Sequence, residues 1–261
     1  MTYLSTVLAD APTHYWRCAD PGGVVANDLG SARPLPLFGI GSTASGTLGY
    51  SGPNAGGGSI VCTNLPWFET IAKLQAVFPI SIDWVLWTPG PRADGAQCFP
   101  WGWADNGNGP YHNELATGIF AFNFGAGASV PVAAPTPNRW HHFAFTYAAL
   151  AANFAYYIDG VLQPATAPSG VVAAWNDHLL LTRRLAAGQG YLGAISEFAI
   201  YNSVLTGAQV NAHFAAIDQQ LQPPVYTQAG KFDLSAGTVA PLGQNVDDIL
   251  NAVRKVYKNT P

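Results

Sequence analysis

The sequence predicts an all-β protein: one sandwich of two antiparallel sheets, followed by a C-terminal extension that ends in a short helix. Residues 78–88 and 138–147 alternate with a period of two and are rich in β-branched and aromatic residues. The chain also has 28 Gly and 20 Pro, with 12% aromatic and only 10% charged residues, which suits many short strands joined by turns. Many strands with one late helix argue against a βαβ fold.

The expected elements can be placed in chain order. Residues 2–9 can form one or two helical turns, which Pro12 would end. Residues 20–58, rich in Gly, Ser, Pro and Asn, are expected to be loops with brief strands, and residues 89–117 one long loop. The expected strands are residues 13–19, 59–63, 78–88, 119–124, 138–147, 153–158, 161–162, 178–183 and 191–201.

Two local signals fix turns and ends. Asp159-Gly160 has the residue types that a tight hairpin turn needs, because both central positions require positive φ. Thr206 and Gln209 form a capping box that predicts the start of a helix. The apolar face of this helix is expected to contain Val210, Phe214, Ile217 and Leu221.

The composition changes at Pro223-Pro224, which divides the chain into a sandwich at residues 1–222 and an extended segment at 223–261. The segment ends in a predicted amphipathic attachment helix, whose apolar stripe is Val246, Ile249, Leu250, Val253, Val256 and Tyr257. A helix of about three turns is marginal alone in water, so this stripe must be buried. It either folds back onto its own sandwich or packs on copies of itself or another protein.

Several motifs resemble one known family. They are LADAPTHYWR, FPISIDWVLWT, NRWHHFAFTY, YYIDGVL and YLGAISEFAIYNSVLTGAQVNAHF, and they occur in family order over roughly residues 1–218. In these motifs the chain resembles the concanavalin A-like, laminin G-like jelly-roll domains, although Cys18 stands where the family usually has leucine. The resemblance implies a jelly-roll sandwich. It implies little about function, because this fold is reused for many tasks.

Catalytic patterns are missing from the sequence. Retaining glucanases of this fold have paired carboxylates in an E-x-D-x-x-E stretch, whereas Asp83 and Glu197 each stand alone here. The sequence also lacks a G-x-S-x-G elbow, an H-E-x-x-H motif and a P-loop. His141 and His142 are adjacent on a strand and point to opposite faces, so structural roles are expected for both. We therefore expect no catalytic residues and no enzymatic activity.

The loop at 89–117 holds the candidate carbohydrate-binding residues Trp101, Trp103, Tyr111 and Asn113. Flat aromatic faces stack on sugars, while amides match sugar hydroxyls. The alternative is that both tryptophans only fold the loop back onto the sandwich, or are buried against a neighbouring subunit. Residues 105–109 (DNGNG) resemble part of a calcium loop, which makes calcium a candidate, although two of the ligand positions are glycine. No other cofactor is expected.

Charge and cysteine content exclude other classes. The net charge is −4 and no basic stripe is present, so nucleic-acid binding is not expected. The N-terminus has neither a basic leader region nor a long apolar run, so a secretion signal and membrane insertion are not expected. Cys18, Cys62 and Cys98 are widely spaced and odd in number, which suggests reduced thiols.

These observations favour a non-enzymatic structural or adhesion protein of a bacteriophage particle, as a minor tail or capsid-surface protein. The layout of one lectin-like domain with a docking segment resembles phage virion proteins of this family. The expected partners are other virion proteins and copies of itself, bound through the tail, with host cell-surface glycan as a further ligand. The expected location is the virion, after synthesis in the host cytoplasm. The alternatives are a cellular carbohydrate-binding module and a glycoside hydrolase.

Overall fold

The computed structural model describes residues of the sandwich, and the predicted tail lies outside the described residues. The residues that it describes are 1–20, 25–26, 28–31, 35–40, 46–54, 58–62, 67–75, 78–89, 98–103, 110–114, 120–124, 129–132, 135–148, 154–164, 176–182 and 190–217. The predicted attachment helix, the calcium-like residues 105–109 and the proposed boundary at 222 lie outside these ranges. Those predictions therefore remain predictions.

Two eight-stranded sheets form the sandwich, and the described strand pairs in both are antiparallel. In sheet A the order is β15 (Val161–Leu162), β14 (Phe154–Ile158), β13 (Arg139–Tyr147), β8 (Ile80–Thr88), β18 (Ala194–Tyr201), β5 (Gly58–Cys62) and β4 (Gly46–Ser51), and β1 (His14–Trp16) also pairs with β18.

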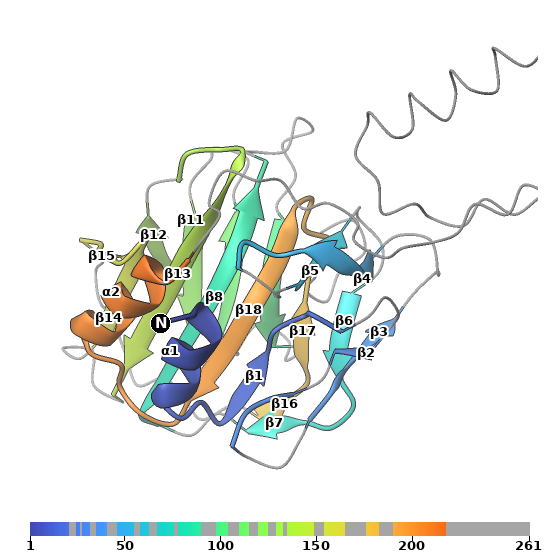
Figure 1. Cartoon of the computed structure of the whole chain (residues 1–261), viewed down its shortest axis with the longest axis horizontal. Coiled ribbons are helices and arrows are strands. Elements are labelled where there is room, and N and C mark those ends of the chain that lie inside the picture. Colours follow the sequence, from blue (N-terminus) through green and yellow to red (C-terminus); the bar gives the residue numbers. More distant parts are fainter. Residues whose placement is uncertain are drawn as a thin grey trace, which may run out of the picture.

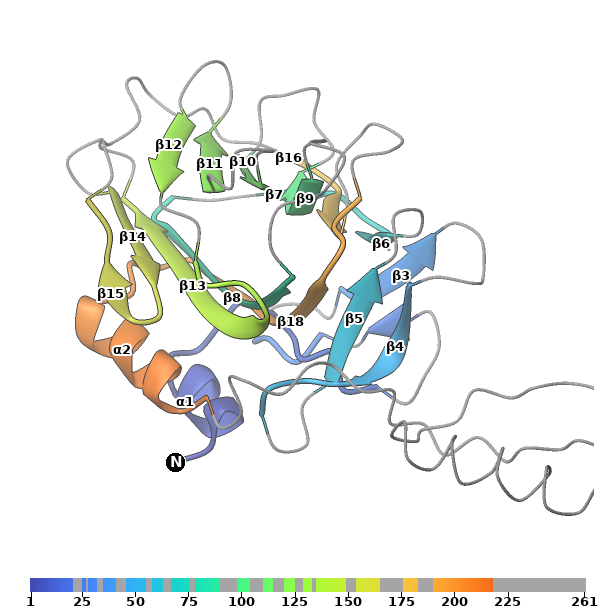
Figure 2. The ribbon, with the colours of Figure 1, turned by 90° about the horizontal axis from the view of Figure 1, so that it is seen from above.

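Sheet B faces the inner side of sheet A (Figure 2). Its order is β12 (Ser129–Val132), β11 (Phe120–Phe124), β10 (Pro110–Glu114), β9 (Cys98–Trp103), β17 (Leu179–Leu181), β6 (Trp67–Thr70), β3 (Leu37–Ile40) and β2 (Val25–Ala26). A small third sheet pairs β16 (Asn176–Asp177) with β7 (Leu74–Gln75).

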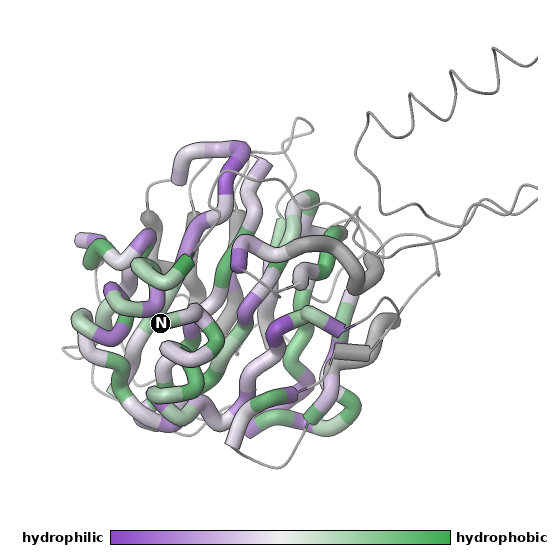
Figure 3. The backbone as a smooth tube through the Cα atoms, in the orientation of Figure 1, coloured by the Kyte–Doolittle hydropathy of each residue, from purple (hydrophilic) through white to green (hydrophobic). Residues whose placement is uncertain are grey.

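Two helices cover the outer face of sheet A, so the molecule has three layers (Figures 1 and 2). The first helix, α1 (Tyr3–Ala9), begins after Thr2, whose side chain caps it. The second, α2 (Gly207–Ala215), begins with the predicted capping box of Thr206 and Gln209. Hydrophobic and hydrophilic residues are mixed along both helices, as expected when one side is buried and the other exposed (Figure 3).

The larger core cluster lies between the two sheets and is built largely of aromatic rings. Trp84 of β8 is fully buried there, stacked on Phe143 at 5.6 Å and edge-on to Trp101 at 5.0 Å. Offset and edge-to-face pairs of this kind stabilise a core beyond the area that they bury. The predicted burial of Trp84 and Trp140 is confirmed.

A second core cluster lies between sheet A and the helices, and it buries the other face of the same strands. Tyr3 and Val7 of α1 and Val210 of α2 pack there against Val85 and Trp140. Strand β8 is therefore buried on both faces, although its sequence alternates as a half-exposed strand would. The polar residues of that alternation, Ser81 and Asp83, lie beneath the helices rather than in solvent.

The predicted sandwich is confirmed, with one large error in its elements. The hairpin is present, with φ of 51° at Asp159 and 74° at Gly160. The error is the loop expected at residues 89–117, which contains strands β9 and β10. Trp101 and Trp103 lie on β9 with Gly102 between them, and two aromatic residues spaced by two are what a buried strand face requires.

Candidate functional site

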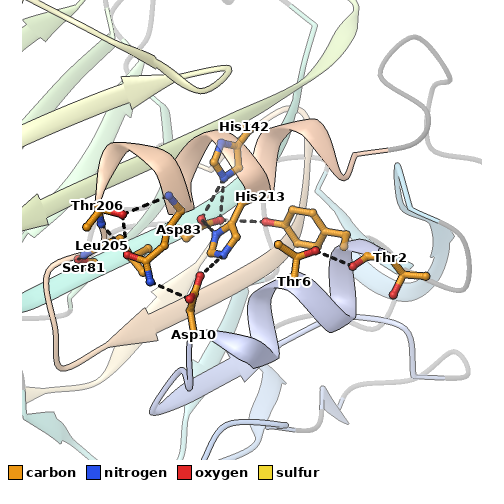
Figure 4. Close-up of polar contacts among 11 residues, drawn as sticks. Thr2, Thr6, Asp10, Ser81, Asp83, His142, Leu205, Thr206 and His213 are labelled. Carbon is orange, nitrogen blue, oxygen red and sulfur yellow. Dashed lines mark hydrogen bonds and ion pairs between the residues drawn. The ribbon is translucent and has the colours of Figure 1, made fainter.

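A buried polar network centres on Asp83, beneath the two helices (Figure 4). Its carboxylate accepts hydrogen bonds from Tyr3 Oη at 2.9 Å, from His142 Nε2 at 3.0 Å and from His213 Nδ1 at 2.6 Å. Asp83, His142 and His213 have no exposed side-chain surface. Four elements, α1, β8, β13 and α2, thus meet on one carboxylate.

Strand register explains why His142 reaches Asp83. Asp83 lies directly opposite Ala144 of β13, and His142 is two residues further along the same strand face. A diagonal neighbour on the same face is within reach of a long side chain. The small side chain of Ala144 leaves the space above Asp83 to the helices.

Asp10, the C-cap of α1, forms the outer part of the network. Its Oδ2 accepts from His213 Nε2 at 2.8 Å and its Oδ1 accepts from Gln209 Nε2 at 2.7 Å. Gln209 is also the N3 residue of the capping box of α2, so the first turn of one helix is bonded to the C-cap of the other. The network therefore joins both helices to each other and to sheet A.

The charges of the network follow from these contacts. Both ring nitrogens of His213 face carboxylates, so both must donate and the ring is an imidazolium. Burial alone lowers the pKa of His213, but Asp83 and Asp10 together raise it above its ordinary value. Burial likewise raises the pKa of Asp83, but His142 and His213 outweigh burial and hold that pKa well below its usual range.

Other carboxylates at motif positions also form hydrogen bonds within the protein. Glu197 is fully buried, where it accepts from Tyr15 Oη and, at 3.1 Å, from Asn54 Nδ2, with Arg17 Nε at 3.4 Å. Burial raises its pKa. A β-bulge in β18 and a φ of 53° place Glu197 in this position. Since Glu197 is enclosed, it is not presented to a large substrate.

Asp159 and Asp28 each hold a turn or a strand end. Asp159 accepts from His141 Nδ1 at 2.7 Å and from the backbone N of His142 at 3.0 Å, which ties the β14–β15 hairpin to β13. Asp28 is bonded in the same way to His14 and to the backbone N of Tyr15. The adjacent His141 and His142 make separate contacts, as the sequence predicts for neighbours on a strand.

The predicted glycan residues are only partly described. Trp101 is fully buried and Trp103 is 1% exposed, and both belong to the core between the sheets. This corrects the expectation that they form a stacking surface, because an indole enclosed on all sides cannot meet a sugar. Tyr111 and Asn113 lie on β10, paired with Gly102 and Ala121, and their side chains fall outside the description.

Sequence reasoning missed a surface group on β6, which we call the Trp67 cluster: Trp67, Glu69 and His178. Burial alternates along β6, so Phe68 and Thr70 face the core while Trp67 and Glu69 are half-buried on the outer face of sheet B. Trp67 Nε1 donates to Glu69 Oε2 at 2.9 Å, and His178 Nδ1 lies 3.6 Å from Glu69 Oε1. The W-x-E spacing is the sequence signal that could have indicated this group.

The Trp67 cluster and β10 lie on one sheet and at one level. Backbone pairing runs from Tyr111 to Gly102, from Gly102 to Leu180, and from Leu180 to Glu69. Three strand spacings of about 4.8 Å put Tyr111 and Glu69 roughly 14 Å apart. The predicted residue Tyr111 and the Trp67 cluster therefore belong to the same row of the sheet.

Comparison with known proteins supports the fold. A family model described as the concanavalin A-like lectin/glucanases superfamily matches residues 84–211. Sequence comparison with curated proteins gives no significant match. None of the described helices is long and apolar enough to span a membrane.

The structure is similar to parts of larger proteins. Trypanosoma rangeli sialidase in complex with the inhibitor DANA superimposes with a TM-score of 0.53 at 12% identity, over 78% of this chain and 32% of the sialidase. The binding domain of botulinum neurotoxin serotype D/C gives 0.55 at 11% identity, over 80% of this chain and 52% of that domain. At such identities the likeness concerns the fold alone. The chain spans about a third of the sialidase and half of the toxin domain.

Proposed function

We propose that the chain is a non-enzymatic recognition protein whose sandwich binds glycan on the outer face of sheet B, at the Trp67 cluster. The observation that carries this proposal is the half-buried indole of Trp67, oriented by its hydrogen bond to Glu69. An indole in a fixed orientation offers an apolar face to the C–H surface of a sugar ring. The fold itself is that of concanavalin A-like lectins and glucanases.

The polar members of the cluster suit sugar hydroxyls. Glu69 Oε1 can accept a hydrogen bond from a hydroxyl, since Trp67 Nε1 donates to the other oxygen, Oε2. Glu69 and His178 are each 28% exposed at the side chain, so both can be reached from solvent. An aromatic face beside a few convergent polar groups is the usual composition of a ligand site.

The carboxylate contacts favour binding without turnover. Glycoside hydrolysis needs two carboxyl groups flanking one bond, about 5–9.5 Å apart and open to the sugar. Within the described residues, Asp83 and Glu197 are enclosed and satisfied by their own chain. The proposal therefore assigns them to the fold rather than to chemistry.

A glycan array tests the binding proposal. Replacing Trp67 with alanine should lower affinity for bound glycans about tenfold, equal to about 1.4 kcal/mol, because the stacking face is lost. Trp87→Ala is the matched control, since Trp87 is also partly exposed but lies on sheet A against Trp140. Equal losses in the two variants would contradict the site, and release of reducing sugar by the wild type would contradict the non-enzymatic role.

We further propose that the protein is part of a bacteriophage particle, as a minor tail or capsid-surface protein attached through residues 223–261. The support is the layout of one lectin-like domain followed by a docking segment, which resembles that of phage virion proteins, and the apolar stripe from Val246 to Tyr257. A stripe of this kind needs a partner, and copies of this chain or another virion protein would supply it.

Truncation tests attachment separately from glycan binding. A chain lacking residues 245–261 should remain folded and monomeric, keep its glycan binding, and fail to enter particles, because the deletion removes the apolar stripe and leaves residues 1–244 unchanged. Light scattering and mass spectrometry of purified particles provide the measurements. A truncated chain that still oligomerises and still enters particles would refute the attachment role.

A further inference from the structure

We infer that Asp83, His142 and His213 form a binding site for a divalent transition-metal ion of the zinc class, enclosed between sheet A and the helices. The three side chains each direct one ligand atom inward, and these atoms all lie within 4.8 Å of one another. Two imidazole nitrogens and a carboxylate oxygen are a donor set that zinc commonly accepts in proteins. The inference is independent of the glycan proposal, which concerns the opposite sheet.

The surroundings of His213 and Asp83 suit metal ligands. Metal-bound histidines usually donate their second ring N–H to a carboxylate or carbonyl, which orients the ring. His213 does this toward Asp10 at 2.8 Å. Ligating carboxylates are likewise held by hydrogen bonds, and Tyr3 Oη donates to Asp83 Oδ1 at 2.9 Å. Both outer contacts can persist when the inner atoms bind an ion.

Charge balance points the same way. Asp83 and Asp10 bring two negative charges, and among the described residues the charged partners of this network are histidines, not Lys or Arg. One imidazolium leaves one negative charge uncompensated in a network whose Asp83 is fully buried and whose Asp10 is 19% exposed, which is unfavourable. A divalent ion bound to neutral imidazoles brings the sum to zero.

The geometry requires a small adjustment. His142 and His213 now touch Asp83 at hydrogen-bond distances of 3.0 and 2.6 Å. A tetrahedral ion with bonds of about 2.0–2.2 Å separates its ligand atoms by roughly 3.3–3.5 Å, so each donor must draw back by less than about 1 Å. The ion would replace the protons that these atoms share. The fourth position would remain for a water or another oxygen.

Refolding with cobalt tests the site. Because the three residues are fully buried, the denatured full chain is refolded with Co²⁺ and then dialysed. We expect about one equivalent of bound ion, visible absorption bands of a tetrahedral centre, displacement by Zn²⁺, and a thermal midpoint that falls when a strong chelator strips the ion. Less than about a tenth of an equivalent in the folded wild type would overturn the inference, and the network would then be purely hydrogen-bonded.

Variants locate the ion. Asp83→Asn and His142→Gln should each lose the cobalt bands, whereas His141→Gln should keep them, because His141 is bonded to Asp159 and Thr136 instead. Retention of the bands in both of the first two variants would overturn the assignment. Where a variant fails to refold, the stoichiometry and chelator response of the wild type decide the question alone. Glycan binding by the Trp67 cluster is measured in parallel and is expected to be independent of metal.

Discussion

Replacing Asp83 with asparagine is expected to lower the free energy of unfolding by about 3–5 kcal/mol when a chelator keeps metal ions away. The carboxylate is fully buried and accepts hydrogen bonds from Tyr3, His142 and His213. An amide in its place removes the charge opposite the imidazolium and turns an N–H₂ donor toward groups that themselves donate. Urea unfolding followed by tryptophan fluorescence measures the change.

A surface carboxylate provides the control. Asp177 Oδ1 lies 3.6 Å from Lys73 Nζ. The side chain of Asp177 is 21% exposed and that of Lys73 is 57% exposed. Asp177→Asn should cost less than about 1 kcal/mol, because solvent screens exposed pairs. If Asp83→Asn proved as mild as this control, the network would not be what holds the helices on sheet A.

The elements that could be predicted from the sequence are those with a strong local pattern. Strands β8 and β13 have nine residues each and strong alternation, the hairpin has Asp159-Gly160, and α2 has its capping box. Each of these signals lies within a few residues, so it could be recognised without knowing the rest of the molecule. The motif resemblance then indicated that these strands form a jelly-roll sandwich.

The glycan site could not be predicted so well, because closely spaced aromatic residues occur both in sugar-binding surfaces and in buried cores. Trp101 and Trp103 suggested a binding loop, yet both pack in the core, where Trp101 contacts Trp84 and Phe198. A surface stack and a core stack use the same residues, and only the neighbouring strand decides between them. Trp67 was overlooked because its strand has only four residues, and its aromatic neighbour Phe68 faces the core.

The buried network depends on contacts that are distant in sequence. Asp83 is 59 residues from His142 and 130 from His213. Each of the three lies in a motif quoted for the family resemblance, but the motifs do not state that their polar residues meet. That follows only from the register of β8 and β13 and from the position of α2. The sequence therefore predicts a structural role for His142 but does not identify its partner.

As the pH falls, protonation of His112 is expected to lower the free energy of unfolding before most carboxylates are protonated. His112 is fully buried beside Trp84 and Phe143, and burial lowers its pKa to about 3. A histidine in the unfolded chain titrates near 6.5. The pKa of His112 is lower in the folded chain than in the unfolded chain, so protonation of His112 favours unfolding. The contribution of this group to the free energy of unfolding is therefore fully present above pH 6.5 and is lost as the pH falls toward 3. The expected slope is about 1.4 kcal/mol per pH unit.

Comparing the wild type with His112→Phe isolates this effect. Between pH 6.5 and 5 the wild type should lose about 2 kcal/mol more than the variant, measured by urea unfolding at each pH. His213 has a raised pKa, so its contribution is complete below 6.5 and lost only as the pH rises. Glu197, whose pKa burial raises, acts in the opposite sense to His112 but equally in both proteins. Parallel stability curves for the two proteins over this range would show that His112 takes up its proton in the folded core without penalty.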